Sequence, residues 1–165
     1  MGGRDETIAI VLEDTGIRKA LRFLEWFRFN IPATTTAIGV ALLAGLVAVQ
    51  LYLLLGPLDW PAWMLPYFSV LTAGWVVAAV VMVVGRSLAI VQLGWALGAF
   101  LSSVYFVIYV VSRGLGLPGA PYLRGWWDFT AGTFGMAFAV GFLGLHLAIL
   151  SGVMIAHPQR RQWHD

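Results

Sequence analysis

The stretch MLPYFSVLTAGWVVAAVVMVVGRSLAIVQLGWALGAFLSSVYFVIYVVS, residues 64–112, decides the fold of this chain. Its only charged residue is Arg86, in the short break Gly85-Arg86-Ser87. A transmembrane helix needs about 20 apolar residues, so the stretch is long enough for two spans and far too long for one. We therefore predict two membrane helices joined by a tight turn, which makes them antiparallel neighbours.

Four apolar runs of this kind follow one another along the chain. Their approximate bounds are 33–55, 64–84, 88–112 and 129–156. The charged residues between Pro32 and Ala156 all lie in the breaks between runs: Asp59, Arg86, Arg113, Arg124 and Asp128. The sequence predicts an all-α integral membrane protein with a four-helix transmembrane bundle over residues 32–156. Residues 1–31 are expected to form a cytoplasmic or interfacial segment, and residues 157–165 a cytoplasmic tail.

The composition excludes a water-soluble domain. Hydrophobic residues make up 60% of the chain and charged residues 11%, whereas soluble domains contain roughly 45–50% and 25%. The formal net charge is only +2, and the basic residues are divided between the membrane borders, so we expect no nucleic-acid binding. There is no cysteine, which excludes disulfides, thiolate metal ligands and a cysteine nucleophile.

The distribution of Lys and Arg predicts the orientation. Eight of these residues belong to one side of the membrane: Arg4, Arg18, Lys19, Arg22, Arg28, Arg86, Arg160 and Arg161. The other side has Arg113 and Arg124. Cytoplasmic loops carry the excess of basic residues. We therefore expect a multi-pass protein of the bacterial cytoplasmic (inner) membrane, with both termini in the cytoplasm.

Residues 15–29 have the pattern of an amphipathic helix that lies on the membrane surface. Apolar side chains recur near helical spacing, at Ile17, Leu21, Leu24 and Phe27. The membrane-surface residues are the cations around the rest of the axis: Arg18, Lys19, Arg22 and Arg28. Such a helix binds anionic lipid through its cations. It either anchors and orients the first span or docks a cytoplasmic partner.

Small residues recur at four-residue spacing in several runs. The expected helix-packing positions are Gly94, Gly98, Gly135, Gly144, Ala148 and Gly152. In lipid, small residues let helix backbones approach closely, and this packing stabilises helix association. Packing inside one bundle accounts for most of these positions. Since a four-helix bundle does not need all of them, the surplus favours contacts with further membrane subunits.

His146 is the one ionisable side chain inside an apolar run. An ionisable group at membrane depth is by default a functional candidate. A neutral imidazole can hydrogen-bond across helices, relay a proton, or ligate a haem or chlorophyll-type cofactor. His157 and His164 lie at or beyond the end of the last run, so neither completes a two-histidine haem site with His146. These readings of His146 remain open at this point.

The apolar runs contain no recognisable catalytic or metal-binding set. There is no intramembrane carboxylate pair, no Ser-His-Asp set and no helical His-Glu metal motif. We also expect no polar stripe along any one helix, although a transporter or intramembrane enzyme would need one. The prediction is therefore against an enzyme and against a metal site.

The segment Tyr109-Val-Val-Ser112-Arg113-Gly114-Leu115-Gly116-Leu117-Pro118-Gly119 resembles part of a group of bacterial membrane proteins. In these small, uncharacterised multi-span proteins of high-GC Gram-positive bacteria, a span ends in Tyr-x-x-Ser-Arg followed by Gly-Leu-Pro. They often place a Glu in the next span, and this chain has none there. The resemblance covers about a dozen residues; it implies a bacterial four-helix membrane protein and no particular activity.

Together these patterns favour a non-catalytic accessory or structural subunit of a larger inner-membrane complex, which would be respiratory, photosynthetic or transport-related. The expected partners are other integral membrane subunits and anionic lipid, and bound lipids are expected. One alternative is a haem- or chlorophyll-type cofactor-binding subunit of an electron-transport complex, with His146 as the ligand. The other alternative is a small membrane transporter.

Overall fold

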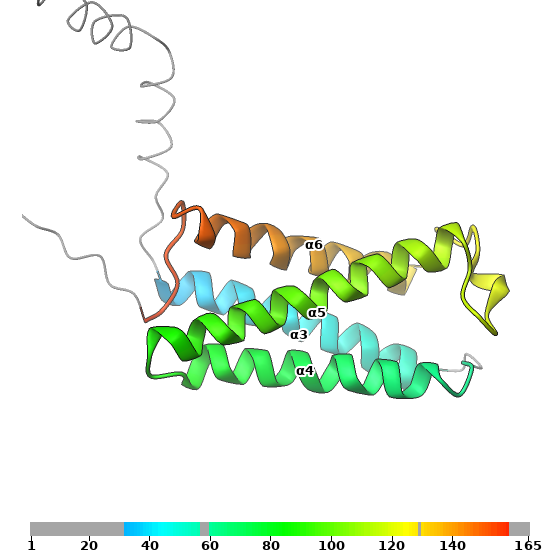
Figure 1. The fold of residues 1–165 in the computed structure, drawn as a ribbon, viewed down its shortest axis with the longest axis horizontal. Coiled ribbons are helices and arrows are strands. Elements are labelled where there is room, and N and C mark those ends of the chain that lie inside the picture. Colours follow the sequence, from blue (N-terminus) through cyan, green and yellow to red (C-terminus); the bar gives the residue numbers. More distant parts are fainter. Residues whose placement is uncertain (1–31, 57–59, 129, 159–165) are drawn as a thin grey trace, which may run out of the picture.

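The computed structural model describes residues 32–56, 60–128 and 130–158. This part of the chain is helical and without strands, with the long helices α3 (Pro32–Leu55), α4 (Met64–Val84), α5 (Leu88–Gly114) and α6 (Thr130–Leu150) (Figure 1). A short 3-10 helix, η1 (Pro121–Leu123), lies in the connection before α6. All four long helices are long and apolar enough to cross a membrane. The prediction of four long apolar helices and no strands is confirmed for the described residues. The predicted surface helix, with Arg18, Lys19, Arg22 and Arg28, lies outside them.

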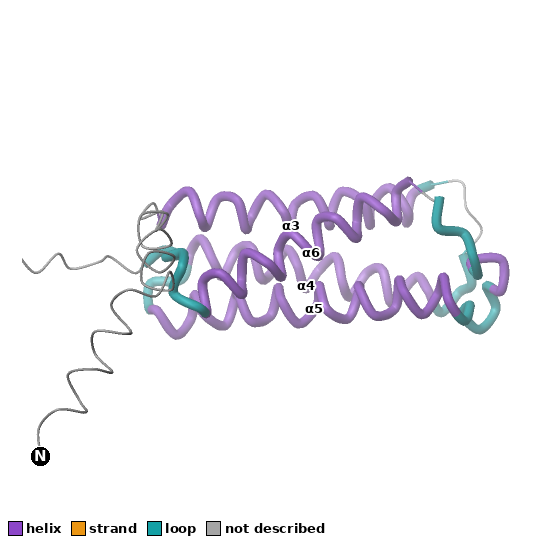
Figure 2. The backbone as a smooth tube through the Cα atoms, turned by 90° about the horizontal axis from the view of Figure 1, so that it is seen from above, coloured by secondary structure: helices purple, strands orange, loops and turns teal. Residues whose placement is uncertain are grey.

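The helices form an up-and-down bundle in which each packs against two neighbours. The packed pairs are α3 with α4, α4 with α5, α5 with α6, and α6 with α3, so the ring closes (Figures 1 and 2). At one end, here the Arg86 end, α4 turns directly into α5. The Ser87 side chain caps α5 there by accepting a 3.3 Å hydrogen bond from the Ile90 amide. The antiparallel neighbours predicted from Gly85-Arg86-Ser87 are present.

The bundle core is filled by large side chains from all four helices. Trp75 of α4, Phe142 of α6 and Leu43 of α3 are fully buried. Trp95 of α5 is 2% exposed and stacks on Phe142, with ring centroids 5.3 Å apart. Aromatic pairs of this kind stabilise a core beyond the area they bury.

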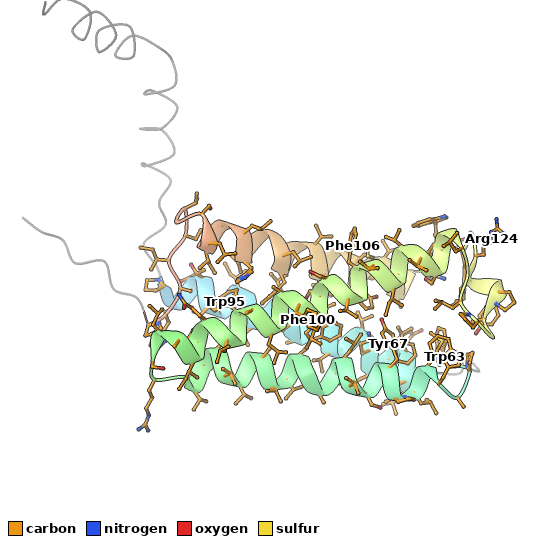
Figure 3. The ribbon with its side chains drawn as sticks, viewed as in Figure 1. Trp63, Tyr67, Trp95, Phe100, Phe106 and Arg124 are labelled. Carbon is orange, nitrogen blue, oxygen red and sulfur yellow. The ribbon has the colours of Figure 1, made fainter. Side chains whose placement is uncertain are left out.

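Arg113 corrects one expectation about the loop charges. The sequence predicts Arg113 in the break after a span that ends near residue 112, but α5 continues to Gly114 and Arg113 is only 4% exposed. Its guanidinium donates a 3.2 Å hydrogen bond to the Leu123 carbonyl and lies 4.9 Å above the Tyr109 ring. The amide of Gly125 donates to the Arg113 carbonyl. A buried cation with these partners fastens the connection containing η1 onto the bundle. We call the end of the bundle that carries this connection the η1 end (Figure 3).

The last helix is shorter than the sequence suggested. The apolar run extends to about residue 156, but α6 ends at Leu150. Gly152 has φ +74°, a left-handed conformation that ends the helix. The chain then turns back toward the start of α3, where the His157 amide donates to the Pro32 carbonyl and to the Thr36 hydroxyl. Hydrophobicity alone did not reveal this reversal.

Candidate functional site: the faces of α6

The bundle covers α6 less than any other long helix. Within the most apolar part of α6, 17% of the residues are buried, against 39% in α5. The inward face of α6 runs through Gly132, Gly135, Ala139 and Phe142, which are all buried. The rest of its circumference is exposed or half-buried. A helix with so much free surface is the natural place to look for an interaction site.

Glycines on the inward faces are used inside the bundle. A Cβ atom at Gly98 would lie 2.7 Å from Cζ of Phe142, and one at Gly94 would lie 3.0 Å from Cγ of Met82. A Cβ atom at Gly135 would collide with the Tyr105 hydroxyl. These three predicted packing positions therefore allow close contact between neighbouring helices of the same chain.

The outward face of α6 carries a second set of small residues. Ala137 and Gly144 are exposed, and Ala148 is half-buried. A Cβ atom at Gly144 would have nothing within 4 Å, whereas one at Gly141, at the edge facing α3, would meet Leu42. Gly152 lies in the turn after the helix and does not extend the face. We call Ala137, Gly141, Gly144 and Ala148 the small-residue face of α6; Val140 and Leu147 flank it, 50% and 64% exposed.

His146 lies on the inward side of α6, near the Arg86 end. Its ring is nearly parallel to that of Trp95, with an interplanar angle of 9° and centroids 6.2 Å apart. Its Nδ1 atom is buried and has no hydrogen-bond partner among the described residues. The interhelical hydrogen bond considered for this side chain is therefore not made through Nδ1. The structure gives His146 a packing role against α5.

The surroundings of His146 do not fit a cofactor held by this chain alone. A histidine that ligates a metal normally donates its other ring N–H to an acceptor that fixes the ring, and Nδ1 has none here. Among the described residues there is also no cluster of three or more His, Asp or Glu side chains suited to a metal ion.

The buried face of α5 holds a polar stripe that the sequence analysis missed. Ser102, Tyr105, Tyr109, Ser112 and Arg113 are all buried along it. The first four follow one another at spacings of three or four residues, which was visible in the sequence, so the prediction of no stripe was wrong. The cavity beside it has a volume of only about 50 Å³. The Tyr105 hydroxyl donates to the Gly132 carbonyl over 3.4 Å, and its ring packs edge-on against Trp75. The stripe therefore joins helices, and the cavity is far smaller than a ligand site of roughly 300–1,000 Å³.

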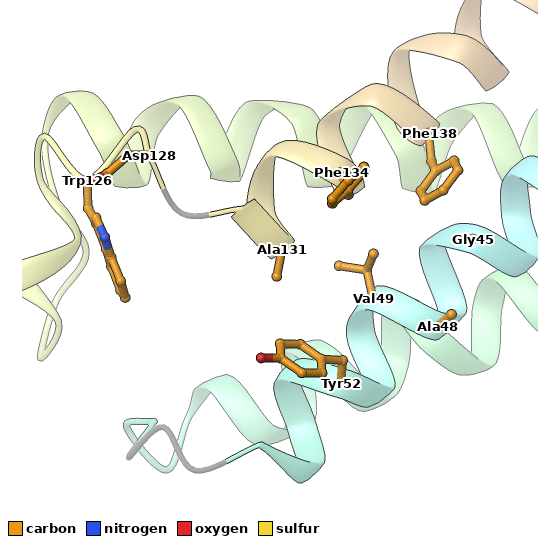
Figure 4. Close-up of a pocket in the computed structure, with 9 residues that line it drawn as sticks. All are labelled: Gly45, Ala48, Val49, Tyr52, Trp126, Asp128, Ala131, Phe134 and Phe138. Carbon is orange, nitrogen blue, oxygen red and sulfur yellow. The ribbon is translucent and has the colours of Figure 1, made fainter.

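A larger groove opens between α3 and α6 at the η1 end. It has a volume of about 630 Å³ and an apolar lining that includes Ala48, Tyr52, Phe134 and Phe138. Trp126 and Asp128 close it where the chain enters α6 (Figure 4). Asp128 is the only acidic residue in the described part of the chain, and its side chain is exposed. The sequence predicts a loop position for Asp128 and no functional role.

No family model, curated protein or solved structure matches this chain.

Proposed function

We propose that this chain is a non-catalytic subunit of a larger membrane complex and that a transmembrane helix of another subunit packs on the small-residue face of α6. The observation that carries the proposal is the open side of Gly144, where a Cβ atom would have no neighbour within 4 Å. Gly94, Gly98 and Gly135 already serve the packing within the bundle. Gly144 and the exposed Ala137 are small residues that the packing of the single chain does not use.

The physics of helix association in lipid supports this role. Lipid tails are as apolar as leucine, so the burial of apolar side chains does not drive helix association in a membrane. Close backbone contact at small residues supplies the van der Waals energy instead. Ala137, Gly141, Gly144 and Ala148 follow one another at spacings of four, three and four residues, and these spacings keep them along one side of the helix. A straight helix of the partner subunit can pack closely along this side of α6.

The location follows as part of the same proposal. Four helices long and apolar enough to span a membrane make a multi-pass membrane protein. The bias of eight basic residues against two supports a cytoplasmic Arg86 end and a bacterial inner membrane. The partner helix would then cross the same bilayer beside α6.

The test is purification of the tagged full chain from its native membrane in a gentle detergent. We expect a complex well above 18.0 kDa that contains other membrane proteins. Gly144→Leu is expected to weaken association by about tenfold, or roughly 1.4 kcal/mol. Ala73→Leu is the matched control, since Ala73 is exposed on α4. A stable monodisperse monomer would refute the proposal, and so would a complex that both variants leave unchanged.

A further inference from the structure

We infer that the groove between α3 and α6 binds a phospholipid with an ethanolamine head group, its acyl chain between the two helices and its head group at Trp126. The groove is lined by other residues of α6 than the small-residue face, namely Ala131, Phe134 and Phe138, and the inference does not depend on the proposed partner helix. Two observations lead to it: the shape and lining of the groove, and the charges at its end.

The body of the groove suits a hydrocarbon chain. Its volume of about 630 Å³ is within the range of sites for small molecules, roughly 300–1,000 Å³. Tyr52 and Phe134 wall it and are 63% and 57% exposed, so it opens sideways, toward the lipid of a membrane. Val49 projects between these aromatic walls, and the small side chain of Ala48 lies beside it on α3 (Figure 4). An acyl chain can enter such a groove from the bilayer without crossing water.

The end of the groove has the charge pattern of a zwitterionic head group. The Asp128 carboxylate lines this end and suits a primary ammonium group. Arg124 lines a shallow hollow that shares Trp126 with the groove, and its guanidinium suits a phosphate. Both side chains are exposed. A head group with phosphate and ammonium would find a group of opposite charge in each of the two hollows that Trp126 lines, whereas an anionic glycerol head group would leave Asp128 without a partner.

Trp126, which lines both hollows, is held in place by contacts at the η1 end. The Arg113 guanidinium, 4% exposed, lies 5.6 Å from the centroid of the Trp126 ring. The Trp126 amide donates to the Leu123 carbonyl, and the Trp127 amide donates to the Gly125 carbonyl. Tryptophan is the residue that membrane proteins place at the level of the head groups. The head-group position is therefore supported from inside the bundle by a buried cation.

The experiment is native mass spectrometry of the full chain with equal amounts of phosphatidylethanolamine and phosphatidylglycerol that have identical acyl chains. We expect the ethanolamine lipid to be retained by about two- to fivefold over the glycerol lipid, as for one exposed ion pair. Asp128→Asn should remove this preference. Arg124→Gln should weaken retention of both phospholipids, while Arg86→Gln, at the far end of the bundle, should change neither.

Ala48→Phe fills the groove and should abolish retention of the bound lipid. The control is Ala73→Phe, which adds the same ring to an exposed position of α4. Thermal unfolding of the variants shows whether each one is folded. Equal retention of both lipids by the wild-type chain would overturn the head-group assignment. Unchanged lipid retention in Ala48→Phe would refute the groove as the lipid site. If that variant instead lost a co-purifying membrane protein and kept its lipid, the groove would be a protein contact and the inference would also be refuted.

Discussion

The outward faces of α4 and α6 differ in the size of the side chains they present. The exposed positions of α4 are mainly valines: Val70, Val76, Val77, Val80, Val83 and Val84. The outward face of α6 has Ala137 and Gly144 at its centre. Both helices are apolar enough for a membrane, so hydrophobicity does not separate them. Branched side chains suit contact with fluid lipid, and small ones suit contact with a second helix. Side-chain size, more than hydrophobicity, distinguishes the two surfaces.

The largest expected effect is a difference in stability between variants on the inward and outward sides of α6. Gly135→Leu forces a side chain against Tyr105 and should destabilise the bundle by about 3 kcal/mol through overpacking. Gly144→Leu should leave the stability of the isolated chain unchanged or raise it slightly, because leucine favours the helix more than glycine. Thermal unfolding of both variants in detergent measures the difference. Similar losses of stability in the two would show that Gly144 faces the bundle interior.

A photo-cross-linking experiment compares α6 with α4 directly. A small aliphatic amino acid with a diazirine group replaces Ala137 in one variant and Ala73 in another. We expect the group at position 137 to form a cross-linked protein in native membranes and the group at position 73 to react with lipid. Gel electrophoresis followed by mass spectrometry identifies the products. Protein products at both positions, or at neither, would remove the distinction between the two faces.

Substitutions of His146 test whether its side chain serves to pack α6 against α5. His146→Ala removes the ring that stacks on Trp95 and should lower the unfolding free energy by about 0.5–1.5 kcal/mol. His146→Phe should recover most of this loss, because it restores an aromatic ring. The visible absorption spectrum of the purified complex should be the same for all three proteins. A band that disappears in both variants would instead identify His146 as a cofactor ligand.

The smallest effect is expected on the outward face of α4. Val76→Ala together with Val80→Ala removes exposed side chains that meet lipid in both the folded and the associated state. Stability should change by less than about 0.5 kcal/mol, and the mass of the purified complex should remain the same. A complex that dissociates in this double variant would place a partner on α4 and would contradict the comparison.

The course of the chain was predictable from a few local signals. The break at Gly85-Arg86-Ser87 predicted the turn between α4 and α5, and a Ser87 cap forms there. The end of α6 was less accessible to sequence reasoning. Its stop depends on the φ of +74° at Gly152 and on hydrogen bonds from His157 to Pro32 and Thr36, and those partners are far away in the sequence.

The candidate sites were harder to predict, because each depends on how helices face one another. Gly98 and Gly144 look alike in the sequence, yet a Cβ atom at Gly98 would meet Phe142 and one at Gly144 would meet nothing. Arg113 had the appearance of a loop charge and is buried against Tyr109. The groove at Asp128 forms between α3 and α6, so no single segment contains it.

By itself, the sequence determined that this chain has four helices suited to a membrane, because length and hydrophobicity are properties of each segment alone. Only the tertiary structure decided which small residues hold the bundle together, where the polar stripe of α5 points and which surfaces stay open. Those properties depend on the rotation of each helix about its axis. Rotation is set by packing against neighbours, here by contacts such as Trp95 on Phe142 and Tyr105 at Gly135. In an almost uniformly apolar helix, no hydrophobic face specifies the rotation in advance.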